Sequence, residues 1–517
     1  MAIDTFAAIY IGTYDVSLKV FEFNGRKKLH EVDHIRSRLD LGRDSIGKEN
    51  IGKNSIGYEK VDELCKTLAE FKRIIEGYRV EHYEVYASAV LRDASNLAFI
   101  LDQIHLRTGL DVKVISNSEH RFISYKTVAG QETFEKMIKT SAAVIDVGGS
   151  SVQITIFRNG KLMFTQHIEA GIMRLYNLLG NGKQPLRMYE TQIEEYLQKK
   201  FEGFHSMYMT EDVDSIIIIS DYARELVQRL EEKGDGKRLV KTDKFVKLIE
   251  KLQKKTLPEI TAELNLADET EPLIIPAMIL FKTLVLNIGP KEVWVPGANI
   301  QDGIAYDYAQ RNKLLSITHD FDADIISAAQ FLSVHYQSYS PHIEALSRLS
   351  IKLFDAMKKV HGLGKRQRLL LEVATILHDC GKFVSLSESQ ENAYQIIKSS
   401  EIIGLTHQER QIVAFTVLYN TQPLEEYEEV SDRLSQEDYL CVAKLSAILR
   451  VANALDQSHR QKFKNMRIAI KGRQLVITVE AFEDISLEQA LFDAKTSYFE
   501  NVYSMKPVLK EKRIYIY

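Results

Sequence analysis

Short runs of apolar residues and of alternating apolar and polar residues near the N-terminus predict β-strands. Apolar side chains dominate residues 7–11, a turn follows at Gly12, and alternation begins over residues 16–22. The second run ends at Asn24-Gly25, a pair typical of two-residue hairpin turns. We therefore expect a strand, a glycine turn, a second strand and an Asn-Gly hairpin.

The same order recurs further along the chain. An apolar strand over residues 143–147 enters a Gly-Gly-Ser-Ser turn at 148–151, and an alternating strand follows over residues 152–157. Another pair, Asn159-Gly160, then predicts a second hairpin. Two similar units that face each other would place their glycine turns on either side of one cleft.

Patterns along the rest of the chain divide it into four parts. Helical periodicity and further strand-like runs continue the mixed α/β pattern to about residue 310, and long amphipathic helices then dominate to about residue 460. A hairpin pattern follows them and marks a small closing module. The predicted domains are residues 1–130, 131–312, 313–462 and 463–517.

Length and composition fit a multidomain globular protein. The chain has 517 residues, too many for one core, and no stretch reads as a membrane span or a signal peptide. Three cysteines without a CxxC pair favour a reducing, cytoplasmic location. The net charge of −4 argues against a general nucleic-acid binder. We therefore expect neither a membrane nor a nucleic acid as partner.

The second glycine turn carries the first indication of chemistry. Glycines allow a tight turn whose N–H groups converge on an anion. Asp146, just before the turn, is suited to hold a divalent cation that neutralises a phosphate. A turn that only connects two strands explains this stretch equally well. The matching turn at Gly12 favours a phosphate site to which each unit contributes one turn.

Eight short segments, spread along the chain, together form a family-like pattern. They are Ala8 to Thr13, Ala87 to Asn96, Ile115 to Glu119, Ile145 to Ser151, Gly171 to Leu175, Ile275 to Leu280, Leu377 to Lys382 and Leu449 to Asp456. In order and spacing the segments resemble the exopolyphosphatase / guanosine pentaphosphate phosphohydrolase (Ppx/GppA) family, and the resemblance covers almost the whole chain.

This resemblance implies an α/β chain with a two-lobed actin-like ATPase (ribonuclease H-like) fold, followed by an all-α HD-like domain and a small C-terminal α/β module. It implies a hydrolase that uses Mg²⁺ to release terminal phosphate from inorganic polyphosphate, or the 5′-phosphate of guanosine pentaphosphate, and that forms a homodimer. The alternative is a catalytically impaired member that binds polyphosphate or a guanosine alarmone as a regulatory protein.

The resemblance also implies roles for particular residues. The metal lies near Asp146, Glu119 activates the water that attacks phosphorus, and Arg92 is a catalytic cation. The phosphate-binding residues are Gly12, Thr13, Gly148, Gly149, Ser150 and Ser151.

Four positions depart from the family pattern. Tyr10 stands where the first turn usually has an aspartate, and Gln153 stands where a glutamate usually follows the second turn. Ser220 replaces a glycine, and Gln301 replaces an arginine. The amide of Gln153 can position a water molecule, but it cannot act as a general base. These replacements support the impaired alternative.

The pair His378 and Asp379, with His342 upstream, looks like the HD metal-phosphohydrolase signature. The later aspartate of that signature is Asn453 here, a poor ligand for a hard cation, although Asp456 lies on the same helix face. Two interpretations stay open. The histidines and aspartates form a weak metal site, or His378 and Asp379 form a buried, hydrogen-bonded structural pair.

Overall fold

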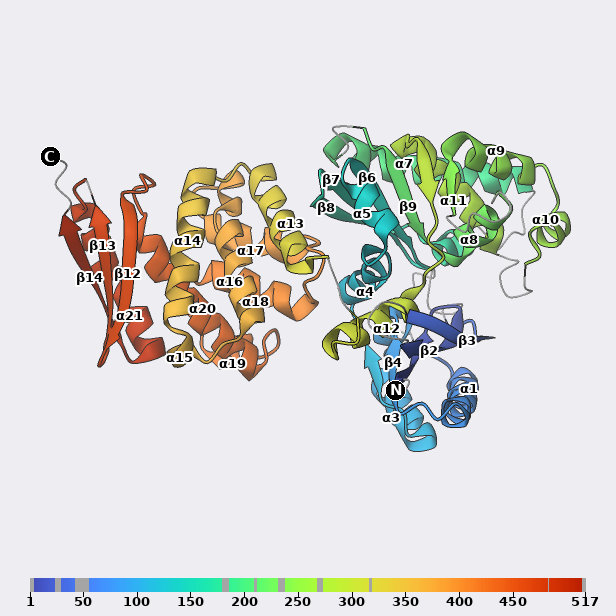
Figure 1. Ribbon diagram of the computed structural model, residues 1–517, viewed down its shortest axis with the longest axis horizontal. Helices are drawn as coiled ribbons and strands as arrows, with labels where there is room; N and C mark the ends of the chain where they lie inside the picture. The colour runs from blue at the N-terminus through green and yellow to red at the C-terminus, as the bar shows by residue number, and fades with distance from the viewer. Residues whose placement is uncertain are drawn as a thin grey trace. The chain divides into compact units, whose positions relative to one another are not determined.

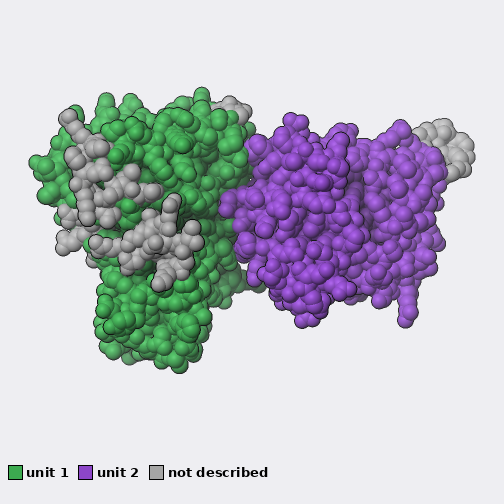
Figure 2. Space-filling model, turned by 180° about the vertical axis from the view of Figure 1, so that it is seen from behind, with its two compact units in different colours: residues 1–320 green, residues 321–517 purple. Residues whose placement is uncertain are grey.

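The computed structural model describes residues 4–23, 29–41, 55–178, 186–208, 212–230, 238–266, 273–315, 319–481 and 483–513. It divides into two compact units, residues 1–320 and 321–517 (Figures 1 and 2). The division lies close to the predicted start of the helical domain. The turn predicted at Asn24-Gly25 lies outside the described residues.

Unit 1 contains two sheets and the helices that flank them. Its elements are β1 (Asp4–Ile11), β2 (Asp15–Phe23), β3 (Leu29–Arg38), α1 (Tyr58–Gly77), β4 (His82–Ala87), α2 (Ala89–Arg92), α3 (Leu97–Thr108), β5 (Val112–Val114), α4 (Asn117–Ala129), α5 (Glu132–Ile138), β6 (Ser141–Val147), β7 (Val152–Arg158), β8 (Lys161–Ile168), α6 (Ile172–Leu178), α7 (Leu186–Tyr208), β9 (Ser215–Ile219), α8 (Asp221–Gln228), β10 (Leu239–Lys241), α9 (Thr242–Leu252), α10 (Leu257–Leu264), α11 (Ile274–Ile288), β11 (Glu292–Trp294) and α12 (Ile300–Arg311).

The two sheets repeat one topology. In the first, with strand order β3-β2-β1-β4-β5, the strands β1, β2 and β3 are antiparallel neighbours and β4 is parallel to β1. In the second, with order β10-β11-β9-β6-β7-β8, the strands β6, β7 and β8 are antiparallel neighbours and β9 is parallel to β6. The predicted repetition is confirmed. Asn159 and Gly160 form the second hairpin turn with positive φ angles, as an Asn-Gly turn requires.

The first strand separates two cores because successive side chains of a strand point to opposite faces. Ala7 and Ile9 face a core that includes buried residues of α1 and α3. Phe6 and Ala8 face a second core, to which α12 contributes Ile304. The first sheet is therefore covered on both faces, which explains the nearly continuous apolar sequence of β1.

Helix α12 packs on the first sheet, although the predicted boundary at residue 312 grouped it with the second lobe. It also crosses α4 closely. A Cβ atom on Gly303 would lie 2.2 Å from the carbonyl oxygen of Ile123, so only glycine allows this approach. The chain thus returns from the second sheet to support α4, the helix that begins at the cleft between the sheets.

Unit 2 is a helical bundle with a small sheet (Figure 1). Its elements are α13 (Phe321–His335), α14 (Ser340–Ala356), α15 (Lys358–His361), α16 (Lys365–Leu377), η3 (Cys380–Phe383), α17 (Ser389–Ser399), α18 (His407–Leu418), α19 (Tyr427–Val430), α20 (Gln436–Leu455), β12 (Phe463–Lys471), β13 (Gln474–Ala481), α21 (Ser486–Tyr503) and β14 (Lys506–Arg513). The predicted hairpin forms β12 and β13, and β14 joins β13 in parallel after α21. Among the described residues, no helix is both long and apolar enough to cross a membrane.

Candidate active site

The two glycine turns have the same hydrogen bond. The N–H of Gly12 donates to the carbonyl oxygen of Asp15 at 2.9 Å, and the N–H of Gly148 donates to that of Ser151 at 3.0 Å. A side chain at Gly12 would be crowded, because its Cβ would lie 2.9 Å from the same carbonyl oxygen of Asp15. The repeated sequence pattern therefore builds the same local turn in each lobe.

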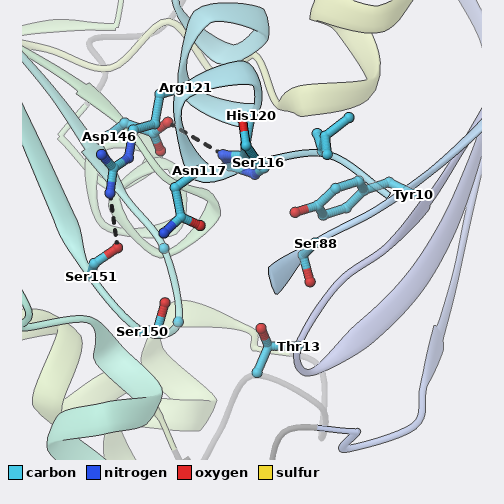
Figure 3. A pocket seen from close by; sticks show the side chains of 13 residues that line it. Tyr10, Thr13, Ser88, Ser116, Asn117, His120, Arg121, Asp146, Ser150 and Ser151 are labelled. Atoms are coloured by element: carbon cyan, nitrogen blue, oxygen red, sulfur yellow. Dashed lines mark hydrogen bonds and ion pairs between the residues drawn. The ribbon is translucent and has the colours of Figure 1, made fainter. Parts of the chain in front are cut away.

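A polar pocket lies between these turns (Figure 3). The first lobe contributes the ends of β1 and β4 and the start of α4, and the second lobe contributes the end of β6 and its turn. The lining residues are Tyr10, Thr13, Ser88, Ile115, Ser116, Asn117, His120, Arg121, Asp146, Gly148, Gly149, Ser150 and Ser151. Hydroxyl groups, one guanidinium group, one imidazole and one carboxylate thus face a common space.

His120 and Asp146 form a close titratable pair in this pocket. His120 Nδ1 lies 3.9 Å from Asp146 Oδ2. Burial raises the pKa of Asp146 to about 6, against the opposing effects of Arg121 and a hydrogen bond from Ser124. Burial and the charge of Arg121 lower the pKa of His120 to about 4. At neutral pH the pocket therefore holds a neutral imidazole beside an ionised carboxylate.

Arg121 brings a positive charge to the same place. Its side chain is only 5% exposed. The register of β6, β7 and β8 places Asp146, Gln153 and His167 opposite one another on neighbouring strands. The guanidinium group contacts His167 and makes a long hydrogen bond of 3.5 Å to Ser151 Oγ. A buried cation next to the second turn is suited to bind a phosphoryl group.

Tyr10 closes the pocket on the side of the first lobe. Its ring lies beside that of His120, with 5.5 Å between the ring centroids. Burial raises the pKa of Tyr10 above its usual range, and a hydrogen bond with Ser88 opposes this rise only in part. Tyr10 therefore stays neutral and supplies a hydroxyl group where a carboxylate would add negative charge.

A second pocket continues from the first and shares Tyr10, Thr13, His120 and Asp146 with it. Its outer part has a different character, because acidic and aromatic side chains line it. Arg36 Nη2 lies 2.7 Å from Asp15 and 3.4 Å from Asp221. Tyr14, Tyr222 and apolar residues complete this part of the lining.

Comparison with known proteins decides the family. The sequence model of the Ppx/GppA phosphatase family matches residues 24–312, and the model of domain III of these phosphatases matches residues 327–495. The chain belongs to the Ppx/GppA phosphatase family. The predicted family is confirmed, and with it the enzyme class, a phosphoanhydride hydrolase.

Related proteins cover most of the chain at low identity. The guanosine-5′-triphosphate,3′-diphosphate pyrophosphatase of Vibrio vulnificus is 21% identical over 429 residues, 80% of each chain. That of Photobacterium profundum is 19% identical over 441 residues, again 80% of each chain. The crystal structure of an exopolyphosphatase from Cytophaga hutchinsonii has a TM-score of 0.51 at 20% identity, and the match covers 60% of this chain and all of that one. The two-lobed α/β fold is confirmed, and the HD-like label of the helical domain stays a prediction.

The Ppx/GppA resemblance led us to expect Glu119 as the base, and the structure places its carboxylate in a helix cap beside the pocket. Glu119 Oε2 accepts the backbone N–H of Ser116 at 2.8 Å, and the N–H of Glu119 donates to Ser116 Oγ at 3.2 Å. This capping box begins α4, and Glu119 does not line either pocket. The sequence contained the signal, because Ser-x-x-Glu is the capping-box pattern. The next residues, His120 and Arg121, reach the pocket.

Arg92, Gln153 and Gln301 are also absent from the residues that line the two pockets. Arg92 pairs with Asp93 and donates to Asn117 Oδ1 at 3.2 Å, so it contacts a lining residue without lining the pocket itself. Gln153 is buried and donates to Thr155, and Gln301 donates to Ser17.

The turn glycines make hydrogen bonds within the protein through part of their backbone groups. The N–H groups of Gly12 and Gly148 close their own turns, and the carbonyl groups of Gly148 and Gly149 accept N–H groups at the start of α6. Of the residues predicted to bind phosphate, Thr13, Gly148, Gly149, Ser150 and Ser151 line the first pocket, and Gly12 lines the second.

Proposed function

We propose that this chain hydrolyses the terminal phosphoanhydride bond of inorganic polyphosphate or of guanosine pentaphosphate in the cleft between the two lobes. One observation carries the proposal. The pocket between the two glycine turns contains the carboxylate of Asp146, the imidazole of His120 and the guanidinium group of Arg121. Side-chain hydroxyl groups line the same pocket. Phosphoryl transfer needs this combination of positioning and charge stabilisation.

The terminal phosphoryl group binds between the turns. Arg121 neutralises part of its charge, and the hydroxyl groups of Thr13, Ser150 and Ser151 donate hydrogen bonds to its oxygens. Because these groups are already in place in the folded protein, little reorganisation is needed when negative charge develops on the leaving oxygen.

His120 is the base of the proposed step. A water oxygen attacks phosphorus, the bond from phosphorus to the bridging oxygen breaks, and the water proton passes to the neutral imidazole. The leaving chain keeps the bridging oxygen and its electron pair. The low pKa of about 4 makes His120 a weak base, which suits a transition state that needs little proton abstraction.

The residues present also fit Mg²⁺. Asp146 Oδ2 is buried and has no hydrogen-bond partner among the described residues. Magnesium in phosphate sites is often held by one or two carboxylates, with substrate oxygens and water completing the shell. Asp146 would be the protein ligand, and the ion would neutralise charge on the phosphate.

The side chains that line the second pocket favour the binding of a nucleotide over the binding of a long phosphate chain. Its cation, Arg36, is already paired with Asp15 and Asp221, and these carboxylates would repel a polyanion. Tyrosine rings and carboxylate oxygens suit the base and hydroxyl groups of a nucleoside. We therefore propose guanosine pentaphosphate as the preferred substrate.

A second candidate function is binding without hydrolysis. Asp146 is the one carboxylate among the residues that line the first pocket, because Glu119 caps α4 and tyrosine occupies position 10. A site with a weak base and a single carboxylate would hold a phosphoryl group and turn it over slowly, which suits a sensor of polyphosphate or of a guanosine alarmone.

The test is phosphate release by the full-length chain with Mg²⁺, from long-chain polyphosphate and from guanosine pentaphosphate. We expect Asp146→Asn to lower kcat by a factor of about 10² or more. Glu119→Gln is the matched control and should keep activity within about threefold, since an amide can still cap α4. If Glu119→Gln alone abolishes release, the assignment of the base is wrong. If no protein releases phosphate but the wild type binds either ligand, the second candidate holds.

A further inference from the structure

The small sheet of unit 2 has one covered face and one open face. Its strands run in the order β12-β13-β14, and α21 packs against the sheet (Figure 1). Leu475, Ile477 and Val479 of β13 are fully buried on the covered face. Because successive side chains of a strand point to opposite faces, the residues between them point away from this core.

The open face is strongly basic. The register of the three strands gathers five exposed cations there: Arg467 and Lys471 from β12, and Lys506, Lys510 and Lys512 from β14. Among the residues that this register places on the open face, Glu480 is the one acidic residue. Five cations against one carboxylate leave an excess of four positive charges.

The one carboxylate of the open face is already engaged. Glu480 accepts a hydrogen bond from Asn465 Nδ2 at 2.8 Å and lies 3.0 Å from Lys512 Nζ. Lys471, Lys506 and Lys510 have no ion pair with any of the described residues. Like charges on one surface repel one another, and a polyanion that lies across them removes this repulsion.

This concentration of charge differs from the average of the chain. The net charge of −4 led us to expect no nucleic acid as partner, but a net charge does not describe a local surface. A basic face on an acidic chain attracts polyanions to one place.

A groove of about 200 Å³ adjoins the sheet at its edge strand, β12. Helix α14 contributes two exposed cations to the groove, Arg348 and Lys352, which lie one helical turn apart. Phe463 and Leu349 give the groove an apolar lining. Asn465 lines the groove and also donates to Glu480 on the open face, so it joins the two surfaces.

The groove indicates which polyanion fits. Inorganic polyphosphate has no apolar part, so it would leave Phe463 and Leu349 unused. A second copy of this chain would bring an equally basic face to the sheet, and like charges would repel. Single-stranded nucleic acid has both a chain of phosphates and unstacked bases, which stack on aromatic rings and form hydrogen bonds with amide groups.

We propose that the open face of this sheet and the adjoining groove bind single-stranded nucleic acid. Arg467, Lys506 and Lys510 hold phosphates along the face, and the ring of Phe463 stacks on one base in the groove. Contacts to phosphate carry no sequence information, so binding is largely independent of sequence. The site uses no residue of the cleft between the lobes and rests on no step of the proposed hydrolysis.

The test is fluorescence anisotropy of the full-length chain with a labelled oligoadenylate RNA of about 12 nucleotides, at about 50 to 200 mM KCl. For contacts to about five phosphates, the logarithm of the association constant should fall with the logarithm of the salt concentration with a slope of about −3.5. Lys506→Gln/Lys510→Gln should make this slope less steep by about 1.4 and weaken binding about tenfold or more at the lowest salt. Phe463→Ala should weaken binding about tenfold and keep the slope, because it removes stacking and no charge.

Three controls make the outcome decisive. Lys247→Gln/Lys254→Gln removes two exposed lysines of unit 1 and should leave affinity and slope unchanged, although the net charge changes equally. Asp146→Asn should bind the RNA as the wild type does, which separates this site from the cleft. The sheet variant Lys506→Gln/Lys510→Gln should release phosphate at the wild-type rate. The proposal is overturned if the wild type binds no RNA, even where it binds long-chain polyphosphate, or if the two double variants bind RNA equally well.

Discussion

His120 and Asp146 belong to different lobes, yet His120 Nδ1 lies 3.9 Å from Asp146 Oδ2. His120 stands in the first turn of α4, and Asp146 stands near the end of β6, just before the second glycine turn begins. The pair exists only when the two lobes are packed together. Chemistry that depends on it is therefore sensitive to the geometry of the cleft.

The first prediction concerns this pair. His120→Gln should lower kcat for phosphate release by a factor of about 10² or more, because glutamine cannot accept the water proton. KM should change little, since the phosphate contacts of Arg121 and the hydroxyl groups remain. Steady-state kinetics with guanosine pentaphosphate measure both constants. A variant with unchanged kcat would exclude His120 as the base.

The second prediction concerns Gly171, which follows β8. A Cβ atom there would lie 2.2 Å from the backbone nitrogen of Ser151 and 2.4 Å from the carbonyl oxygen of Gly149. Gly171→Ala should therefore displace the second turn and lower phosphate release at least about tenfold, with a loss of about 1–3 kcal/mol in the free energy of unfolding. Gly77→Ala is the matched control, because a Cβ atom at this position, the end of α1, would meet nothing within 4 Å. Activity assays and urea unfolding compare the two, and equal behaviour would contradict the prediction.

The third prediction concerns a buried ion pair in the first lobe. Lys19 is 2% exposed and lies 3.1 Å from Asp302, which caps α12, and 2.7 Å from Glu31. Lys19→Met should cost about 3–5 kcal/mol in the free energy of unfolding, because it leaves Asp302 without its partner. The double variant Lys19→Met/Asp302→Asn should recover part of this loss.

The control for Lys19 is an exposed pair. Lys60 lies 2.8 Å from Glu63 on the surface of α1, and Lys60→Met should change the free energy of unfolding by less than about 1 kcal/mol. Urea unfolding followed by circular dichroism measures all variants. Equal losses for Lys19→Met and Lys60→Met would show that burial does not decide the effect.

The fourth prediction concerns pH and His34 on β3. Burial, with the charges of Lys19 and Arg36, lowers the pKa of His34 to about 4 in the folded protein. The unfolded chain takes up this proton near a pKa of about 6.5. Between these values the unfolded state binds more protons, so stability falls as the pH falls.

His34→Gln should therefore reduce the loss of stability between pH 7 and pH 5 by about 1–2 kcal/mol, after allowance for partial exposure. Urea unfolding at the two pH values gives the difference. His30→Gln, an exposed histidine of the same strand, is the control. If the two variants respond alike to pH, His34 does not cause the effect.

Local pattern predicted most elements of the fold. The strand expected over residues 143–147 lies in β6 (Ser141–Val147), and the strand expected over 152–157 is β7 (Val152–Arg158). These elements follow from periodicity and turn residues, which act over a few positions. The packing of α12 on the first sheet was not predicted, because it depends on Ile304 sharing a core with Phe6 and Ala8, which lie far from it in the sequence.

The sequence by itself determined the repeated β-units, their glycine turns, the family and the region of the site, since short-range patterns encode all of these. Only the tertiary structure decided which side chains work together. Helix capping commits Glu119 to α4 and directs His120 and Arg121 into the cleft, and the bundle brings His342 to Asp456. The reason is physical: the direction of a side chain depends on its helical phase and on distant packing partners, neither of which a local pattern contains.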